Sequence, residues 1–385
     1  MRPSAVCVRR GIRNNSCLLH SRRSVRQAGW GKPELSGRSK VAAGMQPCGA
    51  IAVDLFEAPL QELKFAMSGL PLRGVADPPR AASLEPAAAP DPSFLAAKIE
   101  EIERSLNDGS WTEMDFAEVD EALMPGLVAM ANDKKTGLDL CYLPAPKDLC
   151  DSLDAFWRDG LESKRYVVNS GNSATHFVAL DVAVVDGKVS VALFEPTTFD
   201  HTTPCLLAAL IKVAVKRTAL PHAKVVSVAL DIQRSNAECG MFSLALAKKL
   251  LKERDQILAL HKANLAGTLG DRLRASDADR FLPPVFFKHS QGTVRLDSYI
   301  ECDPTEHGRV VNKKGQTLSE RQWATLEEVG GRRLSKSIHL KRLVEYKALA
   351  ERLDAMPGAR AAAPQRWSVP SHEALRTDDG AARRG

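Results

Sequence analysis

The stretch QRSNAECGMFSLALAKK, residues 233–249, decides the fold, because it places a cysteine at the start of an apolar helix. The residues after Cys239 are apolar on nearly every face for two turns, which predicts a buried central helix. Ser235 and Asn236 before it are typical of helix starts. A thiol at a helix N-terminus lies in the positive end of the dipole, which favours the nucleophilic thiolate. Taken alone, Cys239 is more simply read as a small buried core residue.

Composition excludes several classes of protein. The chain has 385 residues and a formal charge of +6, but residues 1–40 alone carry a net charge of +9, which leaves −3 for the rest. We therefore expect no nucleic-acid partner for the body of the protein. No apolar run approaches about 18 residues, so no transmembrane segment is expected. The eight cysteines show no paired spacing, which predicts neither a metal site nor a disulfide framework.

Three regions follow from local composition. Residues 1–93 combine an Arg/Ser-rich start with a Pro/Ala-rich linker, and we expect them to be disordered. The start fits a transit peptide, an export leader or translated upstream sequence. A folded domain is expected over residues 94–355, and a disordered tail over residues 356–385.

Helical and strand patterns alternate within the folded domain, which favours an α+β fold. Ser93 is the expected N-cap of the first helix, and a second helix over residues 113–131 is expected to kink or break at Pro125. The remaining expected elements are helices at 148–162, 204–217, 239–263 and 338–354, strands at 165–169, 175–185, 188–194 and 224–230, a loop and short strand at 281–289, and an irregular segment at 300–335.

A hairpin brings a base to the cysteine. Asp186-Gly187 is a strong two-residue turn signal, so residues whose numbers add to about 373 should pair across it. His176 then lies within reach of Glu195, whose carboxylate can orient the imidazole as a general base for Cys239. Gln233 is a candidate side-chain donor to an oxyanion. Singly, each of these residues is more simply read as solvated or structural; jointly they favour a Cys-His-Glu site.

Five separated blocks of the chain resemble the YopJ family of bacterial effectors over roughly residues 94–350. The order His, Glu, Cys and the intervals of 19 and 44 residues match that family. The blocks are Thr-His176-Phe with Phe-Glu195-Pro, Ile-Gln233-Arg-Ser with Glu-Cys239-Gly-Met-Phe-Ser, Phe286-Phe-Lys288-His289-Ser-Gln-Gly, Val311-Asn-Lys-Lys-Gly, and Ile338-His339-Leu-Lys341-Arg342.

The resemblance implies an adenain-like, ubiquitin-like-protease-type cysteine core, with a central helix against a mixed sheet and helical regulatory elements. It implies transfer of an acetyl group from acetyl-CoA, through a thioester on Cys239, to serine, threonine or lysine of host signalling proteins such as kinases. It further implies type III secretion into the host cell. Lys288 matches the position of the autoacetylated lysine of the family.

Inositol hexakisphosphate is the activator that the resemblance implies, and such a ligand requires a dense group of cations. The candidates are Arg234, His289, Arg332, Arg333, Lys336, His339, Lys341 and Arg342. Without the resemblance, these charges would be read as a solvated face of the last helix.

Two other functions are compatible with the same residues. A cysteine protease that removes ubiquitin or ubiquitin-like modifiers would use the same triad, since both chemistries pass through an acyl-thioester. A non-catalytic host-binding module would carry the triad as a remnant, although the presence of all three residues and Gln233 gives no sign of decay.

Overall fold

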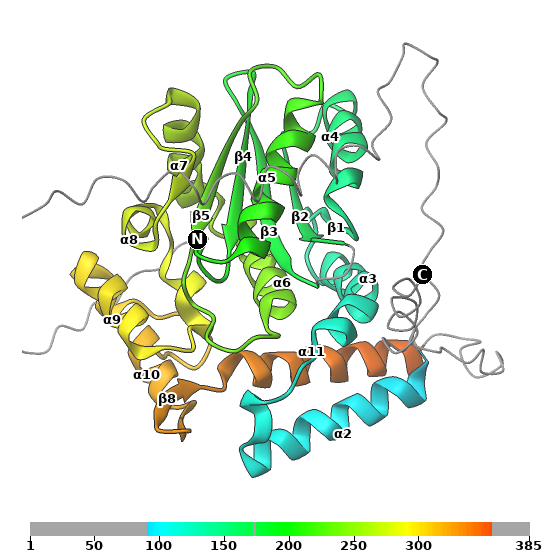
Figure 1. Cartoon of the computed structure of the whole chain (residues 1–385), viewed down its shortest axis with the longest axis vertical. Coiled ribbons are helices and arrows are strands. Elements are labelled where there is room, and N and C mark those ends of the chain that lie inside the picture. Colours follow the sequence, from blue (N-terminus) through cyan, green and yellow to red (C-terminus); the bar gives the residue numbers. More distant parts are fainter. Residues whose placement is uncertain (1–90, 172–174, 356–385) are drawn as a thin grey trace, which may run out of the picture. The chain divides into compact units, whose positions relative to one another are not determined.

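The computed structural model describes residues 91–171 and 175–355 (Figure 1). The disordered regions expected at the N-terminus and in the tail lie almost wholly outside these residues. No helix in the described ranges is long and apolar enough to cross a membrane.

A six-stranded mixed sheet forms the centre of the domain, with its strands in the order β1-β2-β3-β4-β5-β6. Strands β2, β3 and β4 are antiparallel neighbours, whereas β1, β5 and β6 each run parallel to their neighbours. The strands are β1 (Leu140–Leu143), β2 (Ser163–Asn169), β3 (Phe177–Val185), β4 (Lys188–Glu195), β5 (Lys224–Ala229) and β6 (Arg272–Leu273). Strands β1 and β6, at the two edges, were not predicted.

The β3–β4 hairpin has the predicted register. Val185 pairs with Lys188 and Ala179 with Phe194, so the residue numbers of each pair add to 373. Asp186 and Gly187 both have positive φ, at 50° and 72°, as a type I′ turn requires. Because the side-chain period of a strand is two, this turn alone fixes which residues meet at the open end of the hairpin.

Helices cover both faces of the sheet (Figure 1). On one face, α4 and α5 pack against Val178, Leu180 and Leu193. On the other, α3, α6, α7 and α11 enclose a second core that includes Phe177 and Phe194. The helices are α2 (Pro92–Asp108), α3 (Ala117–Lys134), α4 (Leu149–Arg158), α5 (Thr202–Lys216), α6 (Cys239–Leu250), α7 (Arg254–Ala266), α8 (Ala275–Ala278), α9 (Thr293–Cys302), α10 (Leu318–Trp323) and α11 (Ser337–Asp354).

The central helix α6 is buried as predicted. From Cys239 to Leu250 every residue except Lys248 and Lys249 is buried. The expected helix to residue 263 is wrong, because α6 ends at Leu250 and a turn separates it from α7. That turn lets Ile257 and Leu260 of α7 reach the core against the sheet. No glycine or proline marks the break in the sequence.

The cap predicted for the first helix is wrong, and the second helix is not broken at Pro125. The cap of α2 is Asp91, whose carboxylate accepts the Ser93 N–H at 2.9 Å, so Ser93 lies inside the helix. Helix α3 continues through Pro125, since Leu123, Met124 and Leu127 on either side are buried in the core and hold the helix there.

The C-terminal part is more regular than predicted. Residues 281–289 form 3₁₀ turns, Asp279–Phe281 and Pro284–His289, and no strand. The segment expected to be irregular contains the end of α9, all of α10 and a hairpin of β7 (Leu326–Val329) and β8 (Arg332–Ser335). Gly330 and Gly331, with φ of 58° and 71°, form its turn. This Gly-Gly pair was a hairpin signal that the sequence analysis missed.

Candidate active site

His176 and Glu195 meet at the open end of the β3–β4 hairpin. His176 Nε2 lies 2.8 Å from Glu195 Oε2, and the Glu195 side chain is fully buried. The other carboxylate oxygen, Oε1, accepts the Thr197 backbone N–H at 2.9 Å and the Thr197 hydroxyl at 2.7 Å. With its second oxygen held in this way, Glu195 orients the imidazole rather than turning with it.

Cys239 completes the group from the first position of α6. The loop after β5 is tied to the segment after Glu195, because Leu230 N–H donates to Glu195 O and Ile232 N–H donates to Pro196 O. The thiol consequently lies within hydrogen-bonding reach of the His176 ring. Since Nε2 faces Glu195, Nδ1 is the ring nitrogen left for the thiol. The structure therefore brings together the three predicted catalytic residues.

The surroundings of His176 favour its charged form. Burial lowers the pKa of the imidazole, but hydrogen bonds to Cys239 and Glu195 and their negative charges outweigh it and raise the pKa to about 10. The site therefore places a positively charged imidazole beside the Cys239 sulfur.

Gln233, the predicted oxyanion donor, is buried in the same loop. Its Nε2 donates to Ser235 O at 2.7 Å, and its Oε1 has no partner in the described part of the chain. The amide nitrogen carries a second hydrogen. The Cys239 backbone N–H, at the first position of α6, has no acceptor within the helix. These two groups are the candidate donors to an oxyanion.

The eight predicted phosphate-binding cations do not form one surface. Arg342 is fully buried; its Nε and Nη2 bind both oxygens of Asp120 at 3.0 and 2.9 Å, and its Nη1 lies 2.6 Å from Glu238 Oε2. His339 is also buried, with its ring against Trp111 and Nδ1 3.5 Å from Glu238 Oε1. From α11, Arg342 therefore contacts both α3 and Glu238, the residue before α6, and His339 contacts Glu238 as well.

The other predicted cations are spread over several elements. Arg234 is paired with Asp231 at 2.7 Å, and His289 is buried with Nδ1 2.8 Å from the Ser337 hydroxyl. Arg332 and Arg333 are exposed on β8, where Arg333 lies over the Trp323 ring. Lys336 pairs with Glu327, and Lys341 pairs with Glu345.

A different group of cations lies where α6 and α10 pack on the Pro284–His289 segment and α11 packs on α6, and Lys249 Nζ donates to Val285 O there at 2.5 Å. We call it the basic cluster: Lys249, Lys288, Arg321 and Lys341. Burial, and then the charges of Arg321, Lys341 and Lys252, lower the pKa of Lys288 to about 8. Burial lowers the pKa of Lys249 well below its usual value, and Lys288, Lys341 and Arg321 lower it further. Lys341 is paired with Glu345, whereas Lys249, Lys288 and Arg321 have no carboxylate partner among the described residues, so an anion would be favoured beside them.

Sequence reasoning missed Lys249 and Arg321 as members of this cluster. Lys249 belongs to the end of the cysteine helix, and Arg321 to the segment expected to be irregular. Lys288 was predicted as an acetylated residue, and Lys341 as a phosphate ligand. Only the packing of α6 and α10 on the Pro284–His289 segment, and of α11 on α6, brings the four together.

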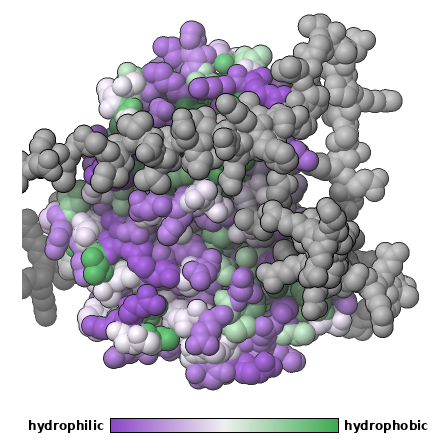
Figure 2. All heavy atoms as spheres, viewed as in Figure 1, coloured by the Kyte–Doolittle hydropathy of each residue, from purple (hydrophilic) through white to green (hydrophobic). Residues whose placement is uncertain are grey.

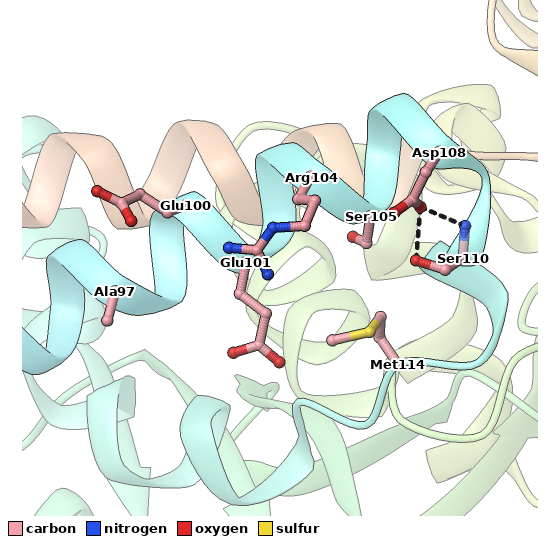
Figure 3. Close-up of a pocket in the computed structure, with 8 residues that line it drawn as sticks. All are labelled: Ala97, Glu100, Glu101, Arg104, Ser105, Asp108, Ser110 and Met114. Carbon is pink, nitrogen blue, oxygen red and sulfur yellow. Dashed lines mark hydrogen bonds between the residues drawn. The ribbon is translucent and has the colours of Figure 1, made fainter.

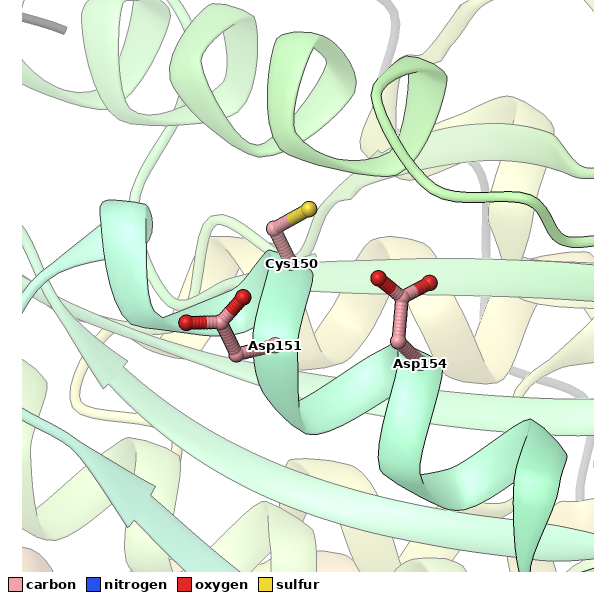
Figure 4. Close-up of side chains that lie close together, drawn as sticks. All are labelled: Cys150, Asp151 and Asp154. Atoms are coloured by element: carbon pink, nitrogen blue, oxygen red, sulfur yellow. The ribbon is translucent and has the colours of Figure 1, made fainter. Parts of the chain in front are cut away.

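Two other features lack the chemistry of an active site. A hollow of about 390 Å³ beside α2 is lined by residues such as Glu101, Arg104 and Met114, and contains none of the catalytic candidates (Figure 3). On α4, Cys150, Asp151 and Asp154 bring their ligand atoms within 4.8 Å of one another (Figure 4). Half-exposed or exposed groups of this kind are common without an ion, and we assign no metal there.

The known proteins that the chain resembles are acetyltransferases. The family model of YopJ serine/threonine acetyltransferases matches residues 95–348. The serine/threonine-protein acetyltransferase YopJ of Yersinia pestis is 40% identical over 254 residues, which are 65% of this chain and 88% of that protein. HopZ1a of Pseudomonas syringae pv. syringae, also a serine/threonine-protein acetyltransferase, is 25% identical over 169 residues, 42% of this chain and 45% of that protein.

Solved structures share the fold. A variant of AvrA, with inositol hexakisphosphate (IP6) and CoA, matches at a TM-score of 0.65 and 40% identity, over 68% of this chain and 98% of that one. HopZ1a with IP6 and CoA matches at a TM-score of 0.55 and 18% identity, over 68% of this chain and 98% of that one.

Proposed function

The chain belongs to the YopJ family of serine/threonine acetyltransferases, and from this premise we propose that Cys239, His176 and Glu195 are its catalytic residues. It is an acetyltransferase; the alternative of a modifier-removing protease is not supported by its relatives. The observation that carries the proposal is the 2.8 Å hydrogen bond between Glu195 and His176, made beside the thiol at the start of α6. The proposed catalytic domain extends over residues 94–355.

In the proposed first step, the Cys239 thiolate attacks the thioester carbonyl of acetyl-CoA. Negative charge develops on the carbonyl oxygen, where the Cys239 backbone N–H and the Gln233 amide are proposed to donate. The bond to the CoA sulfur then breaks, and the leaving thiolate takes the proton from the His176 imidazolium. The acetyl group is left on Cys239 as a thioester.

In the second step, neutral His176 removes the proton from a hydroxyl or amine of the acceptor. The acceptor oxygen or nitrogen attacks the acetyl carbon, and the Cys239 thiolate leaves. Glu195 stabilises the imidazolium that forms in this step and keeps the ring in place. The acceptors proposed are serine, threonine or lysine of host signalling proteins such as kinases. Because the relatives are acetyltransferases of pathogens, we propose delivery into a host cell by type III secretion.

IP6 is the proposed activator, and we place it at the basic cluster rather than on the eight cations first predicted. The relatives solved with IP6 support a polyphosphate ligand. In this chain, Lys249, Lys288 and Arg321 have no carboxylate partner among the described residues, and Lys341, paired with Glu345, adds to their positive field, while Arg342 is fully buried between Asp120 and Glu238. Lys288 is also the proposed autoacetylation site, because in the protein without IP6 its lowered pKa leaves more of the nucleophilic free amine near neutral pH.

The proposal is tested with radiolabelled acetyl-CoA, IP6 and the full chain. The wild-type protein should label itself and an acceptor protein, whereas Cys239→Ala should label neither. Cys302→Ala, which removes an exposed thiol outside the site, is the matched control and should behave as wild type. Labelling that persists in Cys239→Ala would exclude the thioester route.

A further inference from the structure

Gln291 is a fully buried amide between the catalytic loop and the C-terminal part of the domain. Its Oε1 accepts the backbone N–H of Arg234 at 2.6 Å and that of Ser235 at 3.1 Å. Its Nε2 donates to the Ser235 hydroxyl at 2.8 Å. These bonds hold the loop that delivers Cys239, although Gln291 is 52 positions further along the chain.

The backbone of Gln291 joins the same loop to β8. Its N–H donates to Ile232 O at 2.9 Å, and its carbonyl accepts the Ser335 N–H at 2.9 Å. Ile232 N–H in turn donates to Pro196 O, next to Glu195. Four segments are thus hydrogen-bonded in the order Pro196, Ile232, Gln291 and Ser335, and Gln291 joins the catalytic loop to the end of β8.

The other end of this short segment lies in the basic cluster. Lys288 and His289 precede Gln291 by three and two residues. The His289 ring meets the Ser337 hydroxyl at 2.8 Å, and Arg321 Nη2 donates to that hydroxyl at 2.8 Å. A shift of Lys288 or Arg321 is therefore carried by covalent and hydrogen bonds to Gln291.

We propose that Gln291 is a positioning residue that couples occupancy of the basic cluster to the catalytic loop, so that a polyphosphate bound there holds Ser235 and Cys239 in the reactive arrangement. This coupling rests on the proposed function. Without an anion, the positive charges of Arg321 and Lys341 oppose that of Lys288 at the start of the 288–291 segment. With an anion, the segment is held and the Gln291 bonds to residues 234–235 persist.

The test compares Gln291→Leu, which keeps the volume but loses every side-chain hydrogen bond, with Gln291→Glu, which keeps the acceptor oxygens. Gln256→Leu on α7 is the matched control. For each full-length protein, IP6 affinity is measured by calorimetry, and kcat and KM for acetyl-CoA are measured with and without saturating IP6. Ser235→Ala, which removes one partner of Gln291 but leaves the buried amide in place, provides a milder variant should Gln291→Leu not fold.

The expected result is that Gln291→Leu binds IP6 as wild type does but loses at least about five-fold of the stimulation of kcat, the lower range of measured coupling between sites. Gln291→Glu should regain part of it, Ser235→Ala should lose part of it, and Gln256→Leu should lose none. Unchanged stimulation in Gln291→Leu and Ser235→Ala would overturn the coupling, as would a loss that merely follows weaker IP6 binding. If the wild-type protein transfers acetyl groups but IP6 does not stimulate it, the coupling is overturned and the proposed function stands. If the wild-type protein transfers no acetyl group at all, the proposed function is overturned.

Discussion

At the scale of single residues, the chemistry rests on a few buried charges with fixed partners. Glu195 divides its two oxygens between His176 and Thr197, so the imidazole is held in one orientation. Arg342 forms a second buried group with Asp120 and Glu238 at the residue before the nucleophile. Burial raises the pKa of Glu238 despite the nearby Arg342, so this carboxylate depends strongly on its cation.

Replacing Glu195 by Gln should keep a hydrogen-bonding side chain but remove its charge. The pKa of His176 should then fall from its raised value, because one of its stabilising charges is gone. Thioester formation should slow by about 10²–10⁴-fold, the usual contribution of an acid–base group. NMR titration of His176 and rapid-quench kinetics measure the two effects. Glu103→Gln, in an exposed pair with Lys347, is the control, and an unshifted His176 pKa would contradict the assigned role.

Replacing Arg342 by Met should destabilise the protein, since it leaves Asp120 and Glu238 buried without their cation. Loss of one partner of a buried ion pair costs about 3–5 kcal/mol. Arg352→Met, on the same helix but in an exposed pair with Asp133, should cost less than about 1 kcal/mol. Urea unfolding gives both values. Equal, small losses would show that Arg342 is not structural, and would restore it as a phosphate ligand.

At the scale of elements, the hairpin and the cysteine helix were predictable because their signals are local. A two-residue turn fixes the pairing of β3 with β4, and hence the meeting of His176 and Glu195. Two other features, the end of α6 at Leu250 and the burial of Arg342, have no local signal in the sequence. The turn after Leu250 has no glycine or proline, and it exists because α7 packs back on the sheet. Arg342 has the helical spacing of a surface cation, and only the docking of α11 against α3 and α6 buries it.

The basic cluster gives a prediction for pH at this scale. Lys288 has a folded pKa of about 8, and a bound polyphosphate would raise it by favouring the ammonium form. Free protein that has lost this proton must take it up on binding, so IP6 affinity should weaken as the pH rises through about 8. Calorimetry at pH 7, 8 and 9, in buffers of different ionisation enthalpy, measures both the affinity and the proton uptake.

Lys288→Met should bind IP6 more weakly and with a flatter pH dependence over this range. Lys347→Met, on the same helix as Lys341 but paired with Glu103, should keep the wild-type dependence. An affinity that is constant from pH 7 to pH 9 in the wild-type protein would show that Lys288 does not contact the ligand.

At the scale of the whole molecule, the described domain has one site with the geometry for acyl transfer. Hydrophilic residues dominate the coloured surface in Figure 2, and the described chain exposes few large apolar side chains, among them Val294 and Trp323. The fold class and family were predictable because the blocks that resemble the family occur in the same order along this chain. The polyphosphate site was not, because its cations come from separate elements that no local pattern connects.

The central claim is that the acetyl group passes through Cys239, and acid-quenched single turnover with acetyl-CoA and IP6 tests it most directly. Peptide mapping by mass spectrometry should locate one hydroxylamine-labile acetyl group on Cys239 before any appears on the acceptor, and His176→Ala should fail to form it. Acetyl transfer to the acceptor at the wild-type rate, with no acetyl group ever found on Cys239, would contradict the account.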